Sequence, residues 1–234
     1  MTELSEAYEQ KYAAYYQNPR EDLLALVEGS GLAILDIGCG AGAMGKRLLD
    51  LGKARWVSGV EFVPSQAELA RRVLNEVITG DLTQLEFSWS PGFFDRIIAG
   101  DVLEHLVDPW NVLRRLKPLL RPGGFLIVSL PNVRHWWVLR DLILRGEWRY
   151  REAGVLDETH LRFFTQRSAL RMLEETGFKI KSVRPYFWGP KTRNFNRITF
   201  TMFEEFLAQR WLFQVMPIGI VLQMPNDPKL QDVR

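Results

Sequence analysis

The sequence predicts an α/β fold with a doubly wound, mostly parallel sheet and helices on both of its faces. Two observations predict it. Short apolar runs alternate with helical patterns from residue 31 to about residue 130, which is typical of strand–helix–strand crossover units. Four of the apolar runs also lead into an acid, at Asp36, Glu61, Asp81 and Asp101. A single domain is expected, because 234 residues with 47% hydrophobic content can bury one substantial core.

The strongest local pattern is the segment 33–42, which reads Ala-Ile-Leu-Asp-Ile-Gly-Cys-Gly-Ala-Gly. An apolar run that leads into alternating glycines predicts a buried strand followed by a tight loop. Because Gly38, Gly40 and Gly42 lack Cβ atoms, backbone amides can lie against a ligand. The apolar spacing of residues 44–51 then predicts a helix. Strand, loop and helix together are typical of a nucleotide-binding cradle.

Two classes of cofactor compete for this cradle. The spacing Gly40-x-Gly42-x-x-Gly45 matches the dinucleotide fingerprint. Asp36 argues against a dinucleotide, because like charges about 4 Å apart repel by roughly 4 kcal/mol at an effective dielectric near 20. A cofactor with positive charge and no phosphate would instead be stabilised by that carboxylate. Glu61 follows the loop by about 20 residues, where an acid can accept both ribose hydroxyls.

The remaining elements follow in order along the chain. Asn18 and Pro19 predict a capped helix start with proline at the first helical position. Pro64 and Pro109 mark the starts of two later helices. The aromatic and arginine-rich residues 131–165 interrupt the alternation. The segments after them are expected as a helix, a strand, a helix and a final strand over residues 166–177, 179–183, 196–210 and 218–222.

Residues 35–42, Leu-Asp-Ile-Gly-Cys-Gly-Ala-Gly, resemble the first motif of class I S-adenosylmethionine-dependent methyltransferases. Later motifs of that family are matched in order at Glu61 and at residues 80–82, 94–105 and 119–129. The resemblance covers about residues 20 to 180. It implies a Rossmann-like sheet of seven strands whose last strand is antiparallel, and S-adenosyl-L-methionine as the cofactor.

The resemblance also implies a set of cofactor-binding residues. They are Tyr16, Asp36, Gly38, Cys39, Gly40, Gly42, Glu61, Phe62, Asp81, Leu82, Gly100 and Asp101. The acids suit this cofactor, because it carries an ammonium and a sulfonium. Cys39 is expected as a small loop residue and not as a nucleophile.

The three histidines are the candidates for a general base toward a hydroxyl acceptor. His160 is the first candidate and His105 the second, with a structural role as the alternative for each. His160 lies in residues 157–165, which are similar to a segment of methyltransferases that modify polysaccharides and small molecules. The sequence shows no cluster of metal ligands, so we expect no metal.

Arg162, Trp136 and Trp137 are expected on the acceptor side. For the tryptophans, packing within the segment 131–165 is the alternative. Residues 1–130 carry a net charge of −4 and residues 131–234 a net charge of +6. This basic bias fits an anionic acceptor, although scattered, solvated arginines would give the same number.

The chain is expected in the cytoplasm, as a monomer or a homodimer. One cysteine suits a reducing compartment, and no secretory leader is visible. The longest apolar-rich run, residues 211–224, is too short and too interrupted to cross a bilayer. Within one methyltransferase domain, we divide the chain into N-terminal cap helices, a cofactor core, a substrate-side insertion and a C-terminal part at residues 1–30, 31–130, 131–165 and 166–234.

Three functions are compatible with these features. The first is methyl transfer to an oxygen of a small molecule, with a sugar or glycoconjugate favoured by the segment 157–165. The second is a nucleic-acid or protein methyltransferase, against which stand the absence of an Asn/Asp-Pro-Pro-aromatic tetrad and of a dense lysine tract. The third is an NAD-dependent oxidoreductase, disfavoured by the acids. A cofactor-binding module without activity is a further alternative.

Overall fold

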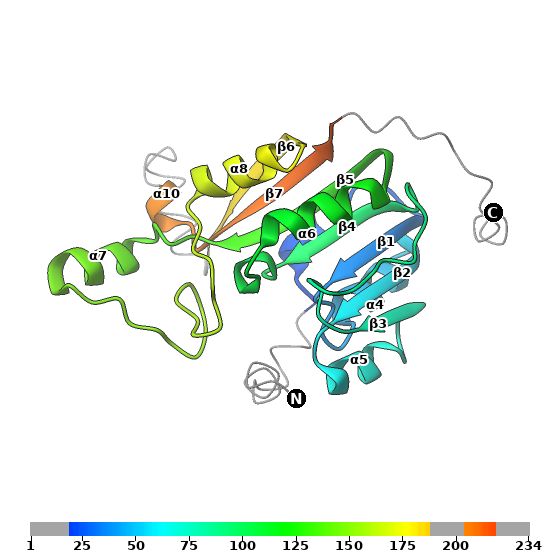
Figure 1. The fold of residues 1–234 in the computed structure, drawn as a ribbon, viewed down its shortest axis with the longest axis horizontal. Coiled ribbons are helices and arrows are strands. Elements are labelled where there is room, and N and C mark those ends of the chain that lie inside the picture. Colours follow the sequence, from blue (N-terminus) through cyan, green and yellow to red (C-terminus); the bar gives the residue numbers. More distant parts are fainter. Residues whose placement is uncertain (1–18, 188–203, 219–234) are drawn as a thin grey trace.

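The computed structural model describes residues 19–187 and 204–218. Its centre is a seven-stranded sheet in the order β3-β2-β1-β4-β5-β7-β6 (Figure 1). β7 runs antiparallel to both of its neighbours, and the other strand pairs are parallel. The strands are β1 (Leu32–Ile37), β2 (Ala54–Glu61), β3 (Glu76–Thr79), β4 (Phe94–Gly100), β5 (Leu120–Pro131), β6 (Phe178–Tyr186) and β7 (Arg210–Pro217). The predicted fold class is confirmed.

Helices cover both faces of the sheet. They are α3 (Glu21–Leu24), α4 (Ala43–Asp50), α5 (Pro64–Ala70), α6 (Pro109–Leu116), α7 (Trp136–Arg145), α8 (Gln166–Glu175) and α10 (Glu204–Leu207), with short 3-10 helices η1 (Leu103–His105) and η2 (Lys117–Leu119). Leu35 and Ile37 of β1 pack in the core that α6 and α8 share. Ile34 faces the other way, into the core with α3, α4 and α5. This alternation is why β1 is apolar along nearly its whole length: both of its faces are buried.

The register of the strands gathers the acids at one edge of the sheet. Asp36 lies opposite Gly59, and Glu61, two residues further along β2, faces the same side. Gly100 pairs with Ser129 at the end of β4. The parallel strands therefore all deliver their carboxyl ends to this edge, where ligands of open α/β sheets bind.

The position of the last strand was predicted wrongly. The strand lies at Arg210–Pro217 and not at residues 218–222; Ile218 follows its end, and residues 219–222 lie outside the described part. The helix predicted to reach Arg210 is seen only as α10, and residues 196–203 lie outside as well. Buried Gln214 is compatible with a central strand because both ends of its side-chain amide are paired. The amide nitrogen donates to the Leu26 carbonyl at 2.7 Å, and the amide oxygen accepts from the Ser182 hydroxyl at 2.6 Å.

The start of the first described helix also differs from the prediction. α3 begins at Glu21, so Pro19 is not its first residue, and Asn18 lies outside the described residues. Arg20 precedes the helix in a left-handed conformation, with φ of 50°, and no side chain caps the helix. The side chain of Arg20 turns instead toward Asp22 and the end of β4.

The segment after β5 leaves the sheet. α7 and the loop behind it project on the side toward which the parallel strands point (Figure 1). This excursion, residues 132–165 between β5 and α8, has a small core of its own, formed by Val138, Val155 and Leu156. Within residues 19–187 and 204–218, no helix is both long and apolar enough to cross a membrane.

Candidate active site

Two positions of the glycine loop between β1 and α4 have no room for a side chain. Gly38 has a φ of +71°, and a Cβ there would lie 2.5 Å from a methyl group of Val102. Gly42 has a φ of +82°, and a Cβ there would lie 2.8 Å from Val73. Both positions therefore require glycine, which places bare backbone at the carboxyl end of β1.

Glu61 ties this loop to β2. Its carboxylate accepts hydrogen bonds from the amides of Gly40 at 2.7 Å and Val63 at 2.9 Å. Burial raises the pKa of Glu61, and hydrogen bonds from the amides of Val63, Gly40 and Phe62 oppose that shift. Because a carboxylate has about four lone-pair positions, Glu61 can still accept a hydrogen bond from the ribose. Phe62, the next residue, is half-buried beside it.

Asp36 is buried at the floor of the same edge. Its Oδ2 atom has no hydrogen-bond partner among the described residues. Burial and the nearby Glu61 raise the pKa of Asp36 to about 8. A buried carboxylate without a partner is costly unless a cation accompanies it. The ammonium or sulfonium of S-adenosylmethionine fits this requirement, and a pyrophosphate does not.

Asp81 lies two residues after β3 and is exposed. Its Oδ1 atom accepts hydrogen bonds from the amide and the hydroxyl of Thr83, at 2.8 and 2.7 Å, which hold the side chain in one orientation. The neighbouring Leu82 is buried in the core with α6. Asp81 therefore offers a fixed acceptor at the edge, whereas the side chain of Leu82 supports the loop from behind.

Cys39 does not offer its thiol to the crevice. The side chain is buried with Met44 and Leu48 of α4, and its sulfur would lie 2.6 Å from a Cβ at Gly59. Burial raises the pKa of this thiol well above its ordinary value, and Asp36 and Glu61 add to the shift. The thiol is therefore neutral.

Asp101, at the end of β4, is held by cations that the sequence did not suggest. Its Oδ2 atom pairs with the guanidinium groups of Arg20 and Arg210, each at 3.0 Å. Burial alone would raise the pKa of Asp101, but Arg20 and Arg210, with a hydrogen bond from the Ser129 hydroxyl, hold it well below its usual range. Gly100 has no room for a side chain, since a Cβ there would lie 2.6 Å from a methyl group of Leu23 in α3.

A second polar group, formed by Glu104, His105 and His160, lies next to Asp101. Glu104 and His105 of η1 meet His160, which is far along the chain. The His105 and His160 rings are 4.7 Å apart between centroids and meet edge to face. Nε2 of His160 lies 4.0 Å from Oε1 of Glu104. The structure thus brings both base candidates together, beside the buried carboxylate of Glu104.

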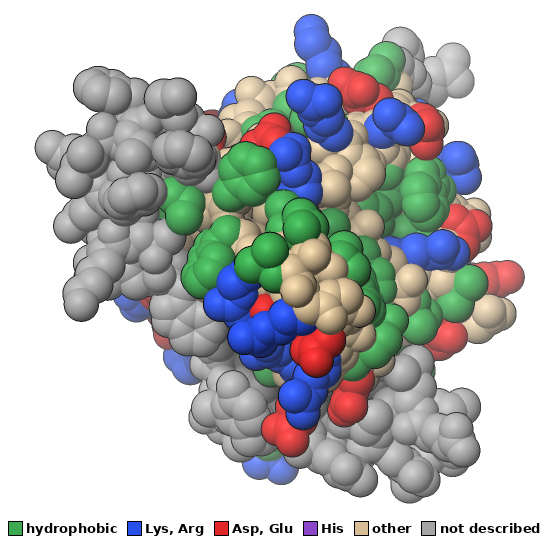
Figure 2. All heavy atoms as spheres, turned by 90° about the vertical axis from the view of Figure 1, so that its left-hand side faces the viewer, with side chains coloured by type: hydrophobic (Ala, Val, Ile, Leu, Met, Phe, Trp, Pro, Cys, Tyr) green, Lys and Arg blue, Asp and Glu red, His purple; other side chains and the backbone are tan. Residues whose placement is uncertain are grey.

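The expected acceptor-side residues do not form one group. The exposed guanidinium of Arg162 donates hydrogen bonds to the Val107 carbonyl. Trp137 packs against the small core of the excursion, with Arg151 over its ring. Trp136 lines an open apolar hollow on α7 together with Phe206 of α10. Figure 2 shows this end of the molecule, where hydrophobic and basic side chains lie next to one another.

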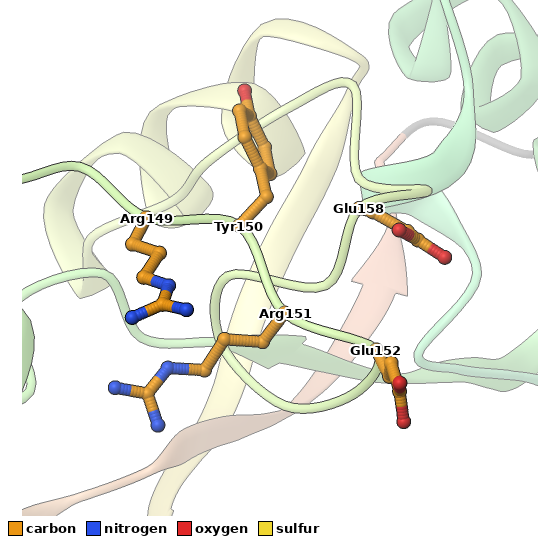
Figure 3. A pocket seen from close by; sticks show the side chains of 5 residues that line it. All are labelled: Arg149, Tyr150, Arg151, Glu152 and Glu158. Atoms are coloured by element: carbon orange, nitrogen blue, oxygen red, sulfur yellow. The ribbon is translucent and has the colours of Figure 1, made fainter.

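The loop after α7 holds a polar pocket of about 440 Å³. Arg149 and Arg151 lie on one side of it and Glu152 and Glu158 on the other, with Tyr150 above (Figure 3). Because the two signs are balanced, this pocket gives no preference for an anionic acceptor. His135, at the start of α7, is buried, and burial lowers its pKa to about 4, so it is neutral.

Comparison with known proteins identifies the class. A family model described as "Methyltransferase domain" matches residues 8–183, and the chain belongs to this family. It is a class I S-adenosylmethionine-dependent methyltransferase. A methyltransferase structure from Mesorhizobium loti superposes with a TM-score of 0.59 at 18% identity, over 83% of this chain and 95% of the other.

Two curated relatives are both named ubiquinone biosynthesis O-methyltransferase. The protein from Aeromonas salmonicida is 27% identical over 70% of this chain and 70% of its own length. The protein from Bradyrhizobium diazoefficiens is 38% identical over 50% of this chain and 47% of its own length. The family implies S-adenosylmethionine as the methyl donor, which answers the choice between the two cofactor classes.

Proposed function

We propose that this enzyme methylates an oxygen of a small-molecule acceptor at the edge formed by β1, β2, β3 and β4. The observation that carries the proposal is the polar group Glu104, His105 and His160 directly behind Asp101. Transfer to a hydroxyl oxygen generally requires that the hydroxyl loses its proton, whereas a neutral amine or an ionised carboxylate is nucleophilic as it stands. The names of the two relatives also refer to O-methyl transfer.

The cofactor side is assigned to the residues at the strand ends. S-adenosylmethionine, when bound, supplies a methyl group on a sulfonium. Asp36 would neutralise its positive charge. Glu61 would accept hydrogen bonds from the ribose hydroxyls, and Asp81 would accept a hydrogen bond from the adenine base. The glycine loop lets its backbone approach the cofactor. Because Asp36 is buried, water would be excluded from the positive charge that this carboxylate faces.

The acceptor side is assigned to the polar group and the excursion. The ring of His160 is fixed because its Nδ1 atom lies 3.1 Å from the Val155 carbonyl and donates to it. The Nε2 atom then carries the lone pair, on the side of Glu104. His105 is fixed in the same way by Thr159. Both imidazoles can therefore serve the deprotonation of a hydroxyl.

Two chemical types of acceptor follow from these observations. The segment 157–165 suggested a sugar or glycoconjugate, whereas the relatives are named for ubiquinone biosynthesis. Methyl transfer from labelled S-adenosylmethionine to a panel of phenols, catechols and free sugars, with the product position read by NMR, tests both types. Methyl ethers among the products are expected. Transfer to amines or nucleic acid, with none to any hydroxyl, would contradict the proposal.

A further inference from the structure

We propose that Glu104, His105 and His160 form a binding site for one divalent transition-metal cation of the zinc type. Each residue offers one ligand atom, and these atoms all lie within 4.8 Å of one another. No metal was expected from the sequence, because His105 and His160 are 55 positions apart and no ligand spacing is visible. The fold brings the three together by placing the segment after the excursion against η1.

The backbone fixes this meeting. The carbonyl of Glu104 accepts hydrogen bonds from the amides of Leu161 and Arg162, each at 2.9 Å. The two ligand-bearing segments are thereby joined directly beside the ligands. In a tetrahedral zinc site with bonds of about 2.0–2.1 Å, neighbouring ligand atoms are roughly 3.4 Å apart. The 4.0 Å between Glu104 and His160 needs only a small side-chain rotation to reach that spacing.

Both imidazoles are oriented as metal ligands are. Nδ1 of His160 lies 3.1 Å from the Val155 carbonyl, and Nδ1 of His105 lies 3.1 Å from the Thr159 carbonyl. The Thr159 hydroxyl donates to Asp157 at 2.6 Å, so toward His105 it acts as an acceptor too. Each ring therefore donates its Nδ1 proton to an oxygen and leaves Nε2 with a lone pair, which is the arrangement that fixes metal-bound histidines.

Glu104 supplies the independent observation. Its side chain is fully buried, and neither carboxylate oxygen has a hydrogen-bond partner among the described residues. The nearest arginines, Arg20 and Arg210, are both paired with Asp101. A buried carboxylate so placed is costly by itself, and a bound cation removes that cost.

The donors also indicate the kind of cation. Two imidazoles and one carboxylate suit zinc, cobalt or iron, whereas magnesium and calcium prefer sites built from oxygen. Three protein ligands leave a fourth position open, as in catalytic zinc sites. His105 is the one ligand of the three that is not fully buried, so entry is from its side.

The catalytic use of the cation rests on the proposed function. A hydroxyl that occupies the open position loses its proton more readily, because the cation stabilises the alkoxide or phenoxide. With the cation bound, the histidines promote this deprotonation through the metal, whereas in metal-free protein they act on the proton directly, since one lone pair on Nε2 cannot do both. The proton leaves to solvent on the side of His105. Binding of the metal itself requires no acceptor and is tested separately.

The test uses untagged, chelator-stripped protein and titrations with zinc, cobalt and magnesium chlorides, with the metal content measured after dialysis. One zinc per chain is expected, with magnesium bound at least about a hundredfold more weakly. Glu104→Gln and His160→Asn should each weaken zinc at least tenfold. His135→Asn, which removes a buried imidazole outside the group, is the matched control and should keep wild-type affinity.

Affinity for S-adenosylhomocysteine and the thermal melting curve show whether each variant is folded. If a variant fails to fold, mass-spectrometric footprinting of wild-type protein with a histidine-modifying reagent replaces it, and zinc should protect His105. Unchanged zinc binding in folded Glu104→Gln and His160→Asn, no zinc in the wild type, or no protection of His105 would each overturn the site. None of these results depends on methyl transfer, so the proposed function fails or stands by its own assay.

Discussion

The Glu61 carboxylate accepts a hydrogen bond of 2.7 Å from the amide of Gly40, which connects the glycine loop after β1 to the end of β2. The same carboxylate is the candidate ligand for the ribose. A ligand that engages Glu61 is therefore held against the loop whose backbone must approach it. Cofactor binding and loop position are coupled through this one side chain.

Glu61→Ala should weaken S-adenosylhomocysteine binding by about 2 kcal/mol or more, because a charged acceptor of two hydroxyls is lost. Because Glu61 is buried and bonds two amides, we expect a loss of about 1–3 kcal/mol in the free energy of unfolding as well. Calorimetry and urea unfolding measure the two effects. The exposed Glu86→Ala is the control, and equal affinities in all three proteins would exclude Glu61 as the ribose ligand.

Cofactor affinity should depend on pH through Asp36. Its pKa of about 8 in the free protein means that the carboxyl is largely protonated below pH 8, while a cationic ligand requires the ionised form. Binding therefore releases a proton, and affinity should rise with pH until about pH 8, by up to roughly tenfold per unit. Asp36→Asn should bind more weakly and lose this dependence. A wild-type affinity that is flat from pH 6 to 8 would contradict the assigned role.

Arg20→Ala should lower stability by about 3 kcal/mol, because it leaves a mostly buried Asp101 with one cation fewer. The depressed pKa of Asp101 stabilises the fold above its unfolded value near 3.9, and this contribution is lost as the pH falls below it. The variant should therefore be less stable at pH 7 and should lose less on acidification. Arg47→Ala removes an exposed ion pair with Glu21 and should cost under about 1 kcal/mol. Equal effects of the two substitutions would contradict this account.

The elements near the glycine loop were predictable because their signals are local. The strand, the glycines and the acids follow one another within a few residues of the chain, so Asp36 and Glu61 could be placed without the fold. Arg20 and His160 could not be paired with Asp101 and Glu104, because the partners are 81 and 56 positions apart in the sequence and neither pair has a spacing pattern.

The last strand shows a different reason for error. Residues 211–215 are buried on both faces, so they lack the alternation that marks a half-exposed strand. Gln214 within them also argues against a buried strand until its partners, Leu26 and Ser182, are known. Those partners precede Gln214 by 188 and 32 positions in the sequence. Only the fold reveals them.

His160→Asn should reduce turnover at least a hundredfold and leave S-adenosylhomocysteine affinity within about twofold, or some 0.4 kcal/mol. The reason is that His160 faces Glu104 and not the residues assigned to the cofactor. Arg162→Ala should have the smaller effect on turnover, since its guanidinium holds the Val107 carbonyl. Initial rates at saturating cofactor measure both. If cofactor affinity and melting temperature fell together in His160→Asn, His160 would have a structural role in the excursion; full activity in both variants would remove the segment from the mechanism.

The central claim is that the acids at the ends of β1, β2 and β3 form a site for a positively charged, phosphate-free nucleoside cofactor. Parallel calorimetric titrations of the wild-type protein with S-adenosylmethionine, S-adenosylhomocysteine and NAD test it most directly. We expect micromolar binding of both S-adenosyl compounds, with one site per chain, and no heat from NAD. Saturable binding of NAD together with silent titrations of the S-adenosyl compounds would contradict the account.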